Sequence, residues 1–172
     1  MASYTAAVPL SLTRRIIFGR DPRRTAVRVI ALAGVAFITF TWLLTPIRTQ
    51  GDSMLPTYRS DTFNLVNRLS YAVGRPSRGD IVAIRLAGPS VVYVKRIVGL
   101  PGERVTFVKG VLHVNGTPLD EPYVRHRRAW DTPELTLSPQ EYYVVGDNRG
   151  MPAGGHSFGA VDRGRILGKV LF

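Results

Sequence analysis

The sequence predicts a mainly β domain behind a single N-terminal membrane-spanning helix. Three observations lead to this prediction. One long apolar run lies near the N-terminus, with arginines crowded before it. The segments after it are rich in β-branched and aromatic residues and are separated by Gly- and Pro-containing turns. No second long helical pattern follows. With 172 residues, the chain has the length of about one domain.

The apolar run is the segment Val29–Ile47, which has nineteen residues and no charge. At 1.5 Å per residue, such a helix crosses a hydrocarbon core of about 30 Å. Trp42 lies near the far end, where interfacial aromatic rings are common, and Pro46 helps to end the helix. A buried helix of a soluble protein would show a polar stripe. A cleaved signal peptide would have a shorter run and a small-x-small site, whereas Arg48–Gly51 follows here.

The distribution of positive charge orients this helix. The net charge is +11, and six arginines precede the run while only Arg48 lies close behind it. The six are Arg14, Arg15, Arg20, Arg23, Arg24 and Arg28. Positive charge accumulates on the cytoplasmic side of membrane helices. We therefore expect a cytoplasmic basic tail (1–28), a transmembrane anchor (29–47) and an extracytoplasmic β-rich domain (48–172).

A strongly basic chain also suits nucleic acid, but the pattern does not favour that partner. The second basic cluster, Arg125–Arg128, has no aromatic interleaving and no nucleic-acid motif around it, so we interpret it as a solvated or lipid-facing loop. A membrane-tethered nucleic-acid binder would rest on charge alone. The chain has no cysteine, which excludes disulfides, thiolate metal sites and a cysteine nucleophile.

Six segments beyond the anchor have the composition of strands. They are 80–85, 90–98, 104–109, 111–114, 142–145 and 165–172. Asn115–Gly116 is a strong hairpin-turn signal, and Gly110 separates two of the segments.

The heptad Gly51–Thr57 (GDSMLPT) lies directly after the anchor. Its serine, Ser53, stands between a permissive glycine and a rigid proline, so its side chain can be held at a defined angle near the membrane surface. A loop serine is more often a solvated turn residue or a cap than a nucleophile. A nucleophilic role requires a base.

Two residue types could supply that base. None of the three histidines, His113, His126 and His156, has a suggestive acidic partner in sequence, although counting alone does not exclude a Ser/His/Asp triad. Of the three lysines, Lys95 lies in an apolar β segment. If its amine points into the core, desolvation lowers its pKa and leaves a neutral base within reach of Ser53. On the strand pattern alone, the alternative is a Lys95 that faces solvent.

Four blocks of sequence together resemble the type I signal peptidases, the Ser/Lys-dyad serine proteases of the bacterial leader peptidase family. They are GDSMLPT after a membrane span, RPSRGDIVAIR, YVKRIVGLPGERV and VVGDNRGMPAGGHSFGAV. The segment VLHVNGTPLDEPYV also resembles the family's second hairpin. The resemblance covers nearly all of residues 48–172 and implies an antiparallel β catalytic domain.

The resemblance also implies an activity, a membrane-bound serine endopeptidase that cleaves N-terminal signal peptides from exported preproteins. It assigns Ser53 as the nucleophile, Lys95 as the general base and the Ser53 N–H as an oxyanion donor, with Met54 and Pro56 shaping the surroundings of the serine. The expected partners are signal peptides and membrane lipids, with no nucleic acid, metal or cofactor. The expected location is the cytoplasmic (inner) membrane. Some relatives have a hydroxyl donor where this chain has Gly51.

The last block departs from the family pattern. Gly146, Asp147, Asn148, Arg149, Phe158 and Gly159 keep the expected spacing, but Pro152, Gly154, Gly155 and His156 replace a serine, an aspartate, a second serine and an arginine. In the family, the first serine helps to hold the lysine amine and the Asp–Arg pair braces the site. We interpret Asp147 and Arg149 as a structural brace near the site, although Asp147 alone would also suit an ordinary turn.

Three interpretations of this departure remain open. Another hydroxyl, with Ser157 the nearest in sequence, or a water molecule could orient Lys95. The chain could be a specialised processing peptidase with a restricted substrate. The glycine pair suggests mobility or a close backbone approach, and both suit a substrate-binding edge. Finally, it could be a catalytically weakened or silent membrane-anchored relative that binds signal peptides. A replacement catalytic role for His156 is the least favoured.

Overall fold

The computed structural model describes residues 21–72, 74–87 and 91–171, in two units that meet at Thr41 and Trp42. Residues 1–20, which include Arg14, Arg15 and Arg20 of the expected basic tail, lie outside the described residues.

The first unit contains the helix α2 (Pro22–Ile38), which the π-helical turn η1 (Thr39–Leu43) continues. Asp21 caps the helix, because its carboxylate accepts hydrogen bonds from the N–H groups of Arg23 and Arg24. The segment Arg23–Leu43 is long and apolar enough to cross a membrane, and none of its apolar window is buried within the protein. These properties fit a helix that meets lipid along its length.

The helical segment ends earlier than the expected anchor, at Leu43. The last four residues of the apolar run, Leu44–Ile47, belong instead to the strand β1 (Leu44–Arg48). This strand pairs along its whole length with β2 (Phe63–Asn67), so Pro46 lies within a strand and does not end the helix. Apolar composition alone does not distinguish the last turn of a helix from a strand that follows it.

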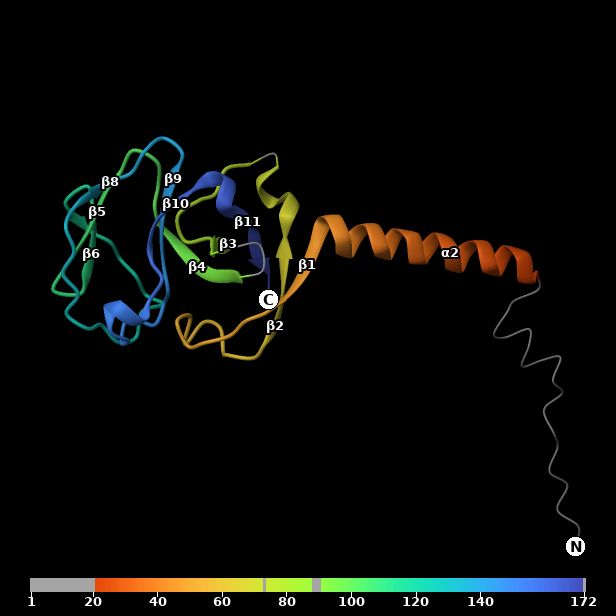
Figure 1. Cartoon of the computed structure of the whole chain (residues 1–172), viewed down its shortest axis with the longest axis horizontal. Helices are drawn as coiled ribbons and strands as arrows, with labels where there is room; N and C mark the ends of the chain where they lie inside the picture. The colour runs from red at the N-terminus through yellow and green to blue at the C-terminus, as the bar shows by residue number, and fades with distance from the viewer. Residues whose placement is uncertain (1–20, 73, 88–90, 172) are drawn as a thin grey trace, which may run out of the picture. The chain divides into compact units, whose positions relative to one another are not determined.

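The second unit consists of two antiparallel sheets, which confirms the prediction of a mainly antiparallel β domain. The larger sheet has the strand order β1-β2-β11-β3-β4-β9-β10, and the smaller has the order β7-β6-β5-β8. Figure 1 shows β5, β6 and β8 on one side of β9 and β10, with β1, β2 and β11 on the other. The remaining strands are β3 (Ile81–Ala87), β4 (Val91–Gly99), β5 (Arg104–Val108), β6 (Val111–Val114), β7 (Thr117–Pro118), β8 (Leu135–Thr136), β9 (Glu141–Val145), β10 (Gly159–Asp162) and β11 (Ile166–Leu171), with short 3₁₀ helices η2 (Arg68–Tyr71), η3 (Ala153–Gly155) and η4 (Arg163–Arg165).

The six segments with strand composition correspond to β3, β4, β5, β6, β9 and β11. The strands β1, β2, β8 and β10 were not expected, whereas β7 directly follows the predicted hairpin turn. The hairpin between β6 and β7 turns at Asn115 and Gly116, which have φ angles of 52° and 80°. Both residues therefore adopt the left-handed conformation that the Asn-Gly signal predicts for a tight hairpin.

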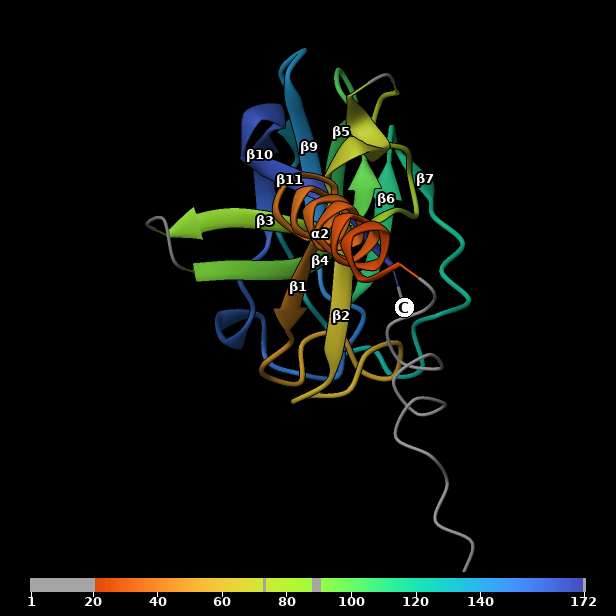
Figure 2. The same ribbon diagram turned by 90° about the vertical axis from the view of Figure 1, so that its right-hand side faces the viewer.

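Alternation along β3 places the core on both faces of the larger sheet. Val82 and Ile84 pack into one buried cluster, while Ala83 between them packs into another, together with Val94 and Met54. Figure 2 shows β3 and β4 side by side, and Val94 lies opposite Ala83 in their pairing. Met54, one residue after Ser53, is therefore fixed to the central strands of the sheet.

Candidate active site

Ser53 lies in the loop that connects β1 to β2. Hydrogen bonds between Thr49 and the Asp61–Thr62 end close the base of this loop. Gly51 has a φ of 84°, the left-handed conformation for which glycine is the favoured residue. Met54 is buried in the core, so the chain on the carboxyl side of the serine is anchored by packing. Pro56, which was expected to shape the surroundings of the serine, is exposed.

Asn148 joins the serine loop to the connection between β9 and β10. Its backbone N–H donates to the Ser53 carbonyl over 3.0 Å, and its side-chain amide donates to the Asp52 carbonyl over 3.0 Å. These two bonds fix the peptide group before Ser53 and the peptide group after it. Asn148 was not among the expected site residues, although it lies in the recognised GDNR sequence.

Lys95 projects from β4, and its Nζ lies 2.6 Å from Ser53 Oγ. The side chain faces inward: Lys95 is only 2% exposed and shares its strand face with the buried Ile97. The two atoms are within hydrogen-bond distance, which is the geometry that a nucleophile and its base require. The structure thus brings together the serine and the lysine that the sequence singled out, although 42 residues separate them.

Burial lowers the pKa of Lys95 to about 8, because removing the ammonium from water disfavours its charged form. The negative charge of Asp147 acts in the opposite direction but more weakly. A lysine with this pKa has a substantial neutral fraction near physiological pH, which an exposed lysine lacks. The amine can therefore accept a proton from a hydroxyl that is in contact with it.

A cleft of about 540 Å³ opens onto the dyad. Its walls come from the end of β1 and the residues after it (47–51), from the serine loop (Ser53, Met54, Tyr58 and Arg59) and from Val92–Lys95 of β4. The segment of β4 before Arg96 pairs with β3 on one side, while β9 joins the other side only from Arg96 onward. Among the described residues, a strand edge without a pairing partner therefore borders the cleft, and such an edge can pair with an extended peptide.

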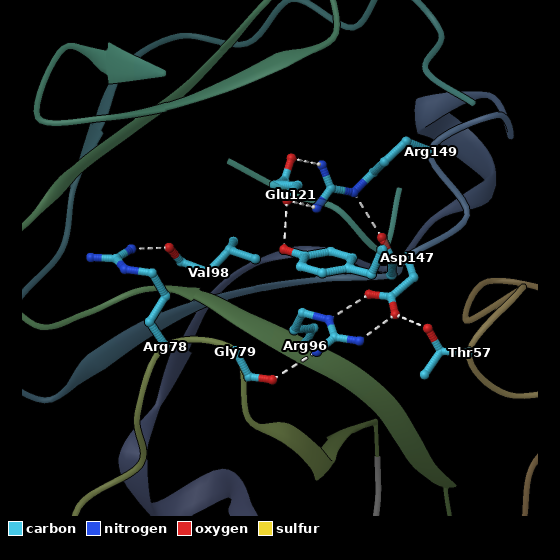
Figure 3. Close-up of polar contacts among 10 residues, drawn as sticks. Thr57, Arg78, Gly79, Arg96, Val98, Glu121, Asp147 and Arg149 are labelled. Atoms are coloured by element: carbon cyan, nitrogen blue, oxygen red, sulfur yellow. Dashed lines mark hydrogen bonds and ion pairs between the residues drawn. The ribbon is translucent and has the colours of Figure 1, made fainter. Parts of the chain in front are cut away.

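Asp147 forms the centre of a buried polar network (Figure 3). Arg96, next to Lys95 in β4, donates to both Asp147 carboxylate oxygens over 2.8 and 2.6 Å. Thr57, from the serine loop, donates to Asp147 Oδ2 over 2.5 Å. Asp147 itself is 1% exposed. One carboxylate thus links the strand that carries the lysine, the loop that carries the serine and the connection after β9.

Arg149 belongs to a second buried ion pair, with Glu121 (Figure 3). Its guanidinium donates to Glu121 over 3.0 and 2.5 Å and to the Gly146 carbonyl over 2.8 Å, and it is 1% exposed. The Tyr123 hydroxyl donates to Glu121 over 2.8 Å, and its ring lies 3.9 Å from the Arg96 guanidinium carbon. Tyr123 therefore connects the two pairs. Arg96, Glu121 and Tyr123 were not among the expected site residues.

The chain matches the family described as signal peptidase, peptidase S26, over residues 23–172. The chain belongs to the signal peptidase family. Signal peptidase I of Bacillus caldolyticus is 38% identical over 137 residues, covering 72% of this chain and 75% of that protein. Signal peptidase IB of Staphylococcus aureus strain Mu50 is 31% identical over 156 residues, covering 80% and 81%. A crystal structure of a signal peptidase I from Enterococcus faecalis matches with a TM-score of 0.45 and 27% identity, over 58% of this chain and 99% of that one.

Membership of this family confirms the resemblance on which the sequence prediction rested, and it makes the chain a serine endopeptidase. The positions at which this signal peptidase departs from the family pattern lie in and around η3. Pro152, Gly154 and Gly155 are exposed. A Cβ on Gly154 would meet nothing within 4 Å, and one on Gly155 would meet only the end of Met151 at 3.8 Å. Neither position requires glycine for steric reasons, so no close backbone approach explains the pair.

The three histidines lie in different surroundings. His113 lies in β6 of the smaller sheet, with Nδ1 3.1 Å from the Val111 carbonyl, and His126 is exposed in the basic cluster. His156 is buried, and its Nε2 lies 2.8 Å from the Asn148 carbonyl. Ser157 is exposed, and its hydroxyl makes no hydrogen bond to the described residues, Lys95 included. The same described part of the chain holds no group of three His, Cys, Asp or Glu residues suited to a metal.

The Glu121–Arg149 pair supports a prediction about stability. Glu121→Gln removes one charge of a pair whose side chains are 0% and 1% exposed, so the Arg149 charge remains buried without compensation. We expect the free energy of unfolding to fall by about 3 kcal/mol. Urea unfolding followed by near-UV circular dichroism measures this change. The matched control is Glu134→Gln, because Glu134 and Arg104 form an ion pair whose side chains are 43% and 54% exposed. The control should change the free energy by less than about 1 kcal/mol, and equal losses in the two variants would contradict the prediction.

Proposed function

We propose that this chain is a membrane-anchored signal peptidase that cleaves N-terminal signal peptides from exported preproteins, with Ser53 as nucleophile and Lys95 as general base. The 2.6 Å contact between Lys95 Nζ and Ser53 Oγ is the observation that carries the assignment of these roles. The family relation supports the activity, and the lowered pKa of the lysine supports its role as a base.

The chemistry begins with attack of Ser53 Oγ on the carbonyl carbon of the scissile bond while Lys95 takes the hydroxyl proton. The tetrahedral intermediate then collapses. The C–N bond breaks, and Lys95 gives its proton to the leaving amine, which becomes the N-terminus of the mature protein. The signal peptide is left as an ester of Ser53. Water attacks this ester, Lys95 accepts the water proton, and its return to Ser53 Oγ releases the signal peptide with a new carboxylate.

The negative charge on the intermediate requires a hydrogen-bond donor. The Ser53 N–H has no acceptor among the described residues, although the neighbouring carbonyls of Asp52 and Ser53 both accept from Asn148. This N–H is therefore free to donate to an oxyanion formed at the serine. We propose it as the backbone donor of the oxyanion site, in a chain that has Gly51 where some relatives supply a hydroxyl.

The cleft suits an extended peptide. The segment Val92–Lys95 contributes an unpaired strand edge beside the dyad, and Ile47 adds an apolar side chain to the lining. Backbone pairing with this edge would hold the signal peptide in register, while shallow apolar surface favours small side chains at the first and third positions before the cut.

The helical segment Arg23–Leu43 would hold the enzyme at the membrane from which signal peptides emerge. Arg23, Arg24 and Arg28 are exposed at its beginning, while Trp42 is exposed near its end. We propose that the helix spans the cytoplasmic membrane, with its arginine-rich end in the cytoplasm and the β domain outside.

The catalytic assignment makes a direct prediction. Ser53→Ala and Lys95→Met should each lower kcat/KM for a peptide with a small-x-small cleavage site by at least about a thousandfold, because each removes one half of the dyad. Cleavage is followed by mass spectrometry with the full chain in detergent micelles. Ser157→Ala and Lys109→Met are the matched controls, since both residues are exposed and neither makes a hydrogen bond to Ser53 or Lys95 among the described residues. Cleavage by a folded Ser53→Ala variant at the wild-type rate would refute the assignment.

The electrostatics of the dyad predict the pH dependence. In the wild type, kcat/KM should rise with pH through the pKa of Lys95 at about 8, because only the neutral amine accepts a proton. The Asp147 charge raises this pKa, and Arg96 neutralises that charge. Arg96→Gln should therefore move the acid limb of the profile to higher pH, whereas Asp147→Asn should move it to lower pH. Partial unfolding would lower the activity of both variants but would not shift their acid limbs in opposite directions. Shifts of the same sign in the two variants would contradict this account.

The proposed orientation predicts the location of the C-terminus. A reporter enzyme that is active only outside the cytoplasm, fused after Phe172, should be active in bacterial cells. Replacement of Arg23, Arg24 and Arg28 by glutamine removes charge from the cytoplasmic end of the helix and should lower reporter activity, because the charge difference orients the span. An inactive but folded fusion would place the β domain in the cytoplasm and overturn the orientation.

A further inference from the structure

His156 is a buried titratable residue that the dyad chemistry above does not use. It follows η3, and its ring lies edge-on to Trp130, with 5.0 Å between the ring centroids. Its Nε2 lies 2.8 Å from the Asn148 carbonyl. Because a carbonyl oxygen only accepts hydrogen bonds, Nε2 carries the proton of the neutral ring. The other nitrogen, Nδ1, is therefore an acceptor.

Nδ1 of His156 has no hydrogen-bond partner among the described residues, and it is the single buried side-chain nitrogen or oxygen of that part of the chain in this condition. Buried polar atoms in folded proteins almost always have a partner, so an unpaired one requires a physical explanation. Packing alone does not explain a histidine here, because an apolar ring would fill the space beside Trp130 without burying an unpaired nitrogen.

Nδ1 lies close to the backbone of Ser53. A Cβ built on Gly146 would lie 3.0 Å from His156 Nδ1 and would overlap the Ser53 carbonyl oxygen. Gly146 is the first residue after β9, and it follows Val145, which pairs with Arg96, the neighbour of Lys95 in β4. The imidazole therefore packs on a glycine that also lies against the Ser53 carbonyl.

The Lys95 amine has more hydrogen-bond donors than partners among the described residues. The residue is 2% exposed and its ammonium has three donors, yet Ser53 Oγ is its one hydrogen-bond partner in the described part of the chain. Pro152, at the position where the family resemblance expects a serine that holds the amine, has no hydroxyl. Ser157 is exposed and makes no such bond. A buried amine with unused donors and a buried acceptor without a partner in the described part of the chain thus lie close enough for the charge of Lys95 to act on His156.

We propose that His156 is a positioning residue of the dyad, whose Nδ1 accepts a hydrogen bond relayed by one buried water molecule from the Lys95 amine. The relay holds Nζ against Ser53 Oγ while Nε2–H fixes the Asn148 carbonyl. A water molecule with two such partners and the Ser53 carbonyl beside it has the polar surroundings that buried waters require. This inference rests on the proposed Ser53/Lys95 function and extends it to the altered segment.

The charges around the two residues agree with this arrangement. Burial lowers the pKa of His156, and the positive charges of Lys95 and Arg149 lower it further, while its bond to Asn148 acts in the opposite direction. The ring is therefore neutral over the range in which Lys95 titrates, so Nδ1 remains an acceptor there. Lys95 also faces Asp147, whose charge Arg96 balances, and Tyr58 borders the same cleft.

Two variants separate the functions of the two ring nitrogens. In His156→Gln the side-chain amide reaches the position of Nε2 and can still donate to the Asn148 carbonyl, but nothing replaces Nδ1. In His156→Asn the amide oxygen takes the position of Nδ1, while the bond to Asn148 is lost. His113→Gln is the matched control, because the same change is made in the smaller sheet.

For His156→Gln we expect kcat to fall by about tenfold or more with KM within about twofold of the wild type, since the amine is less well held and the substrate contacts are unchanged. A hydrogen bond to the ammonium favours its charged form, so its loss lowers the Lys95 pKa and moves the acid limb to lower pH by about one unit. His156→Asn should retain the wild-type acid limb and most of kcat, and His113→Gln should match the wild type. Thermal unfolding of each variant checks that it is folded.

Other outcomes would overturn the proposal. A wild-type profile in a folded His156→Gln would show that Nδ1 does not hold the amine. Equal losses in the two His156 variants, or a loss confined to His156→Asn, would assign the residue to bracing Asn148 alone. Failure of the proposed function itself is distinguishable, because the wild type would then cleave nothing. In that case ¹⁵N NMR decides: the His156 Nδ1 resonance should shift with the titration of Lys95 and stop shifting in Lys95→Met, and an unresponsive wild-type resonance refutes the relay.

Discussion

The burial of the Lys95 amine against Ser53 is the interaction on which the rest of the site depends. Burying a charged ammonium costs free energy, and this cost lowers the pKa of the lysine to about 8, as its proposed role as a base requires. The packing of the surrounding fold offsets this free-energy cost. Lys95 lies on β4 in the interior of the seven-stranded sheet, and Met54 packs against the same central strands, so neither half of the dyad can turn toward water without disturbing the core.

The charges near Lys95 are arranged so that its pKa stays low. Asp147 is close enough to raise the Lys95 pKa, and an uncompensated carboxylate there would keep the amine charged. Arg96 and Thr57 both donate to that carboxylate, which disperses its charge and fixes its position. The same ion pair joins β4 to the connection after β9. One buried pair therefore serves both the geometry of the site and the proton affinity of its base.

The sequence predicted those features that depend on local pattern. β-branched segments between turn residues indicated six of the strands, and two blocks in register singled out Ser53 and Lys95, which the structure brings within 2.6 Å of each other. The strand β2 was missed because Asn64 and Asn67 interrupt its apolar pattern, and β1 was missed because it continues the apolar run of the anchor. The orientation of Lys95 stayed open, because its strand is apolar on both faces and alternation carries no signal there.

The polar network could not be read from the sequence, since the two ion pairs on which it depends join residues far apart in the chain. Arg96 is 51 residues from Asp147, and Arg149 is 28 residues from Glu121.

This separation also bears on the altered segment. The family resemblance leads one to expect an ion pair within the connection after β9, and here that pair is replaced by Gly154 and His156. The two flanking residues, Asp147 and Arg149, instead bind partners outside the connection, in β4 and after β7. Because these anchors enclose Asn148, which holds the Ser53 carbonyl, the dyad does not require the internal pair. The internal segment adds one contact, that of His156 Nε2 with the Asn148 carbonyl, to a connection that these anchors already hold in place.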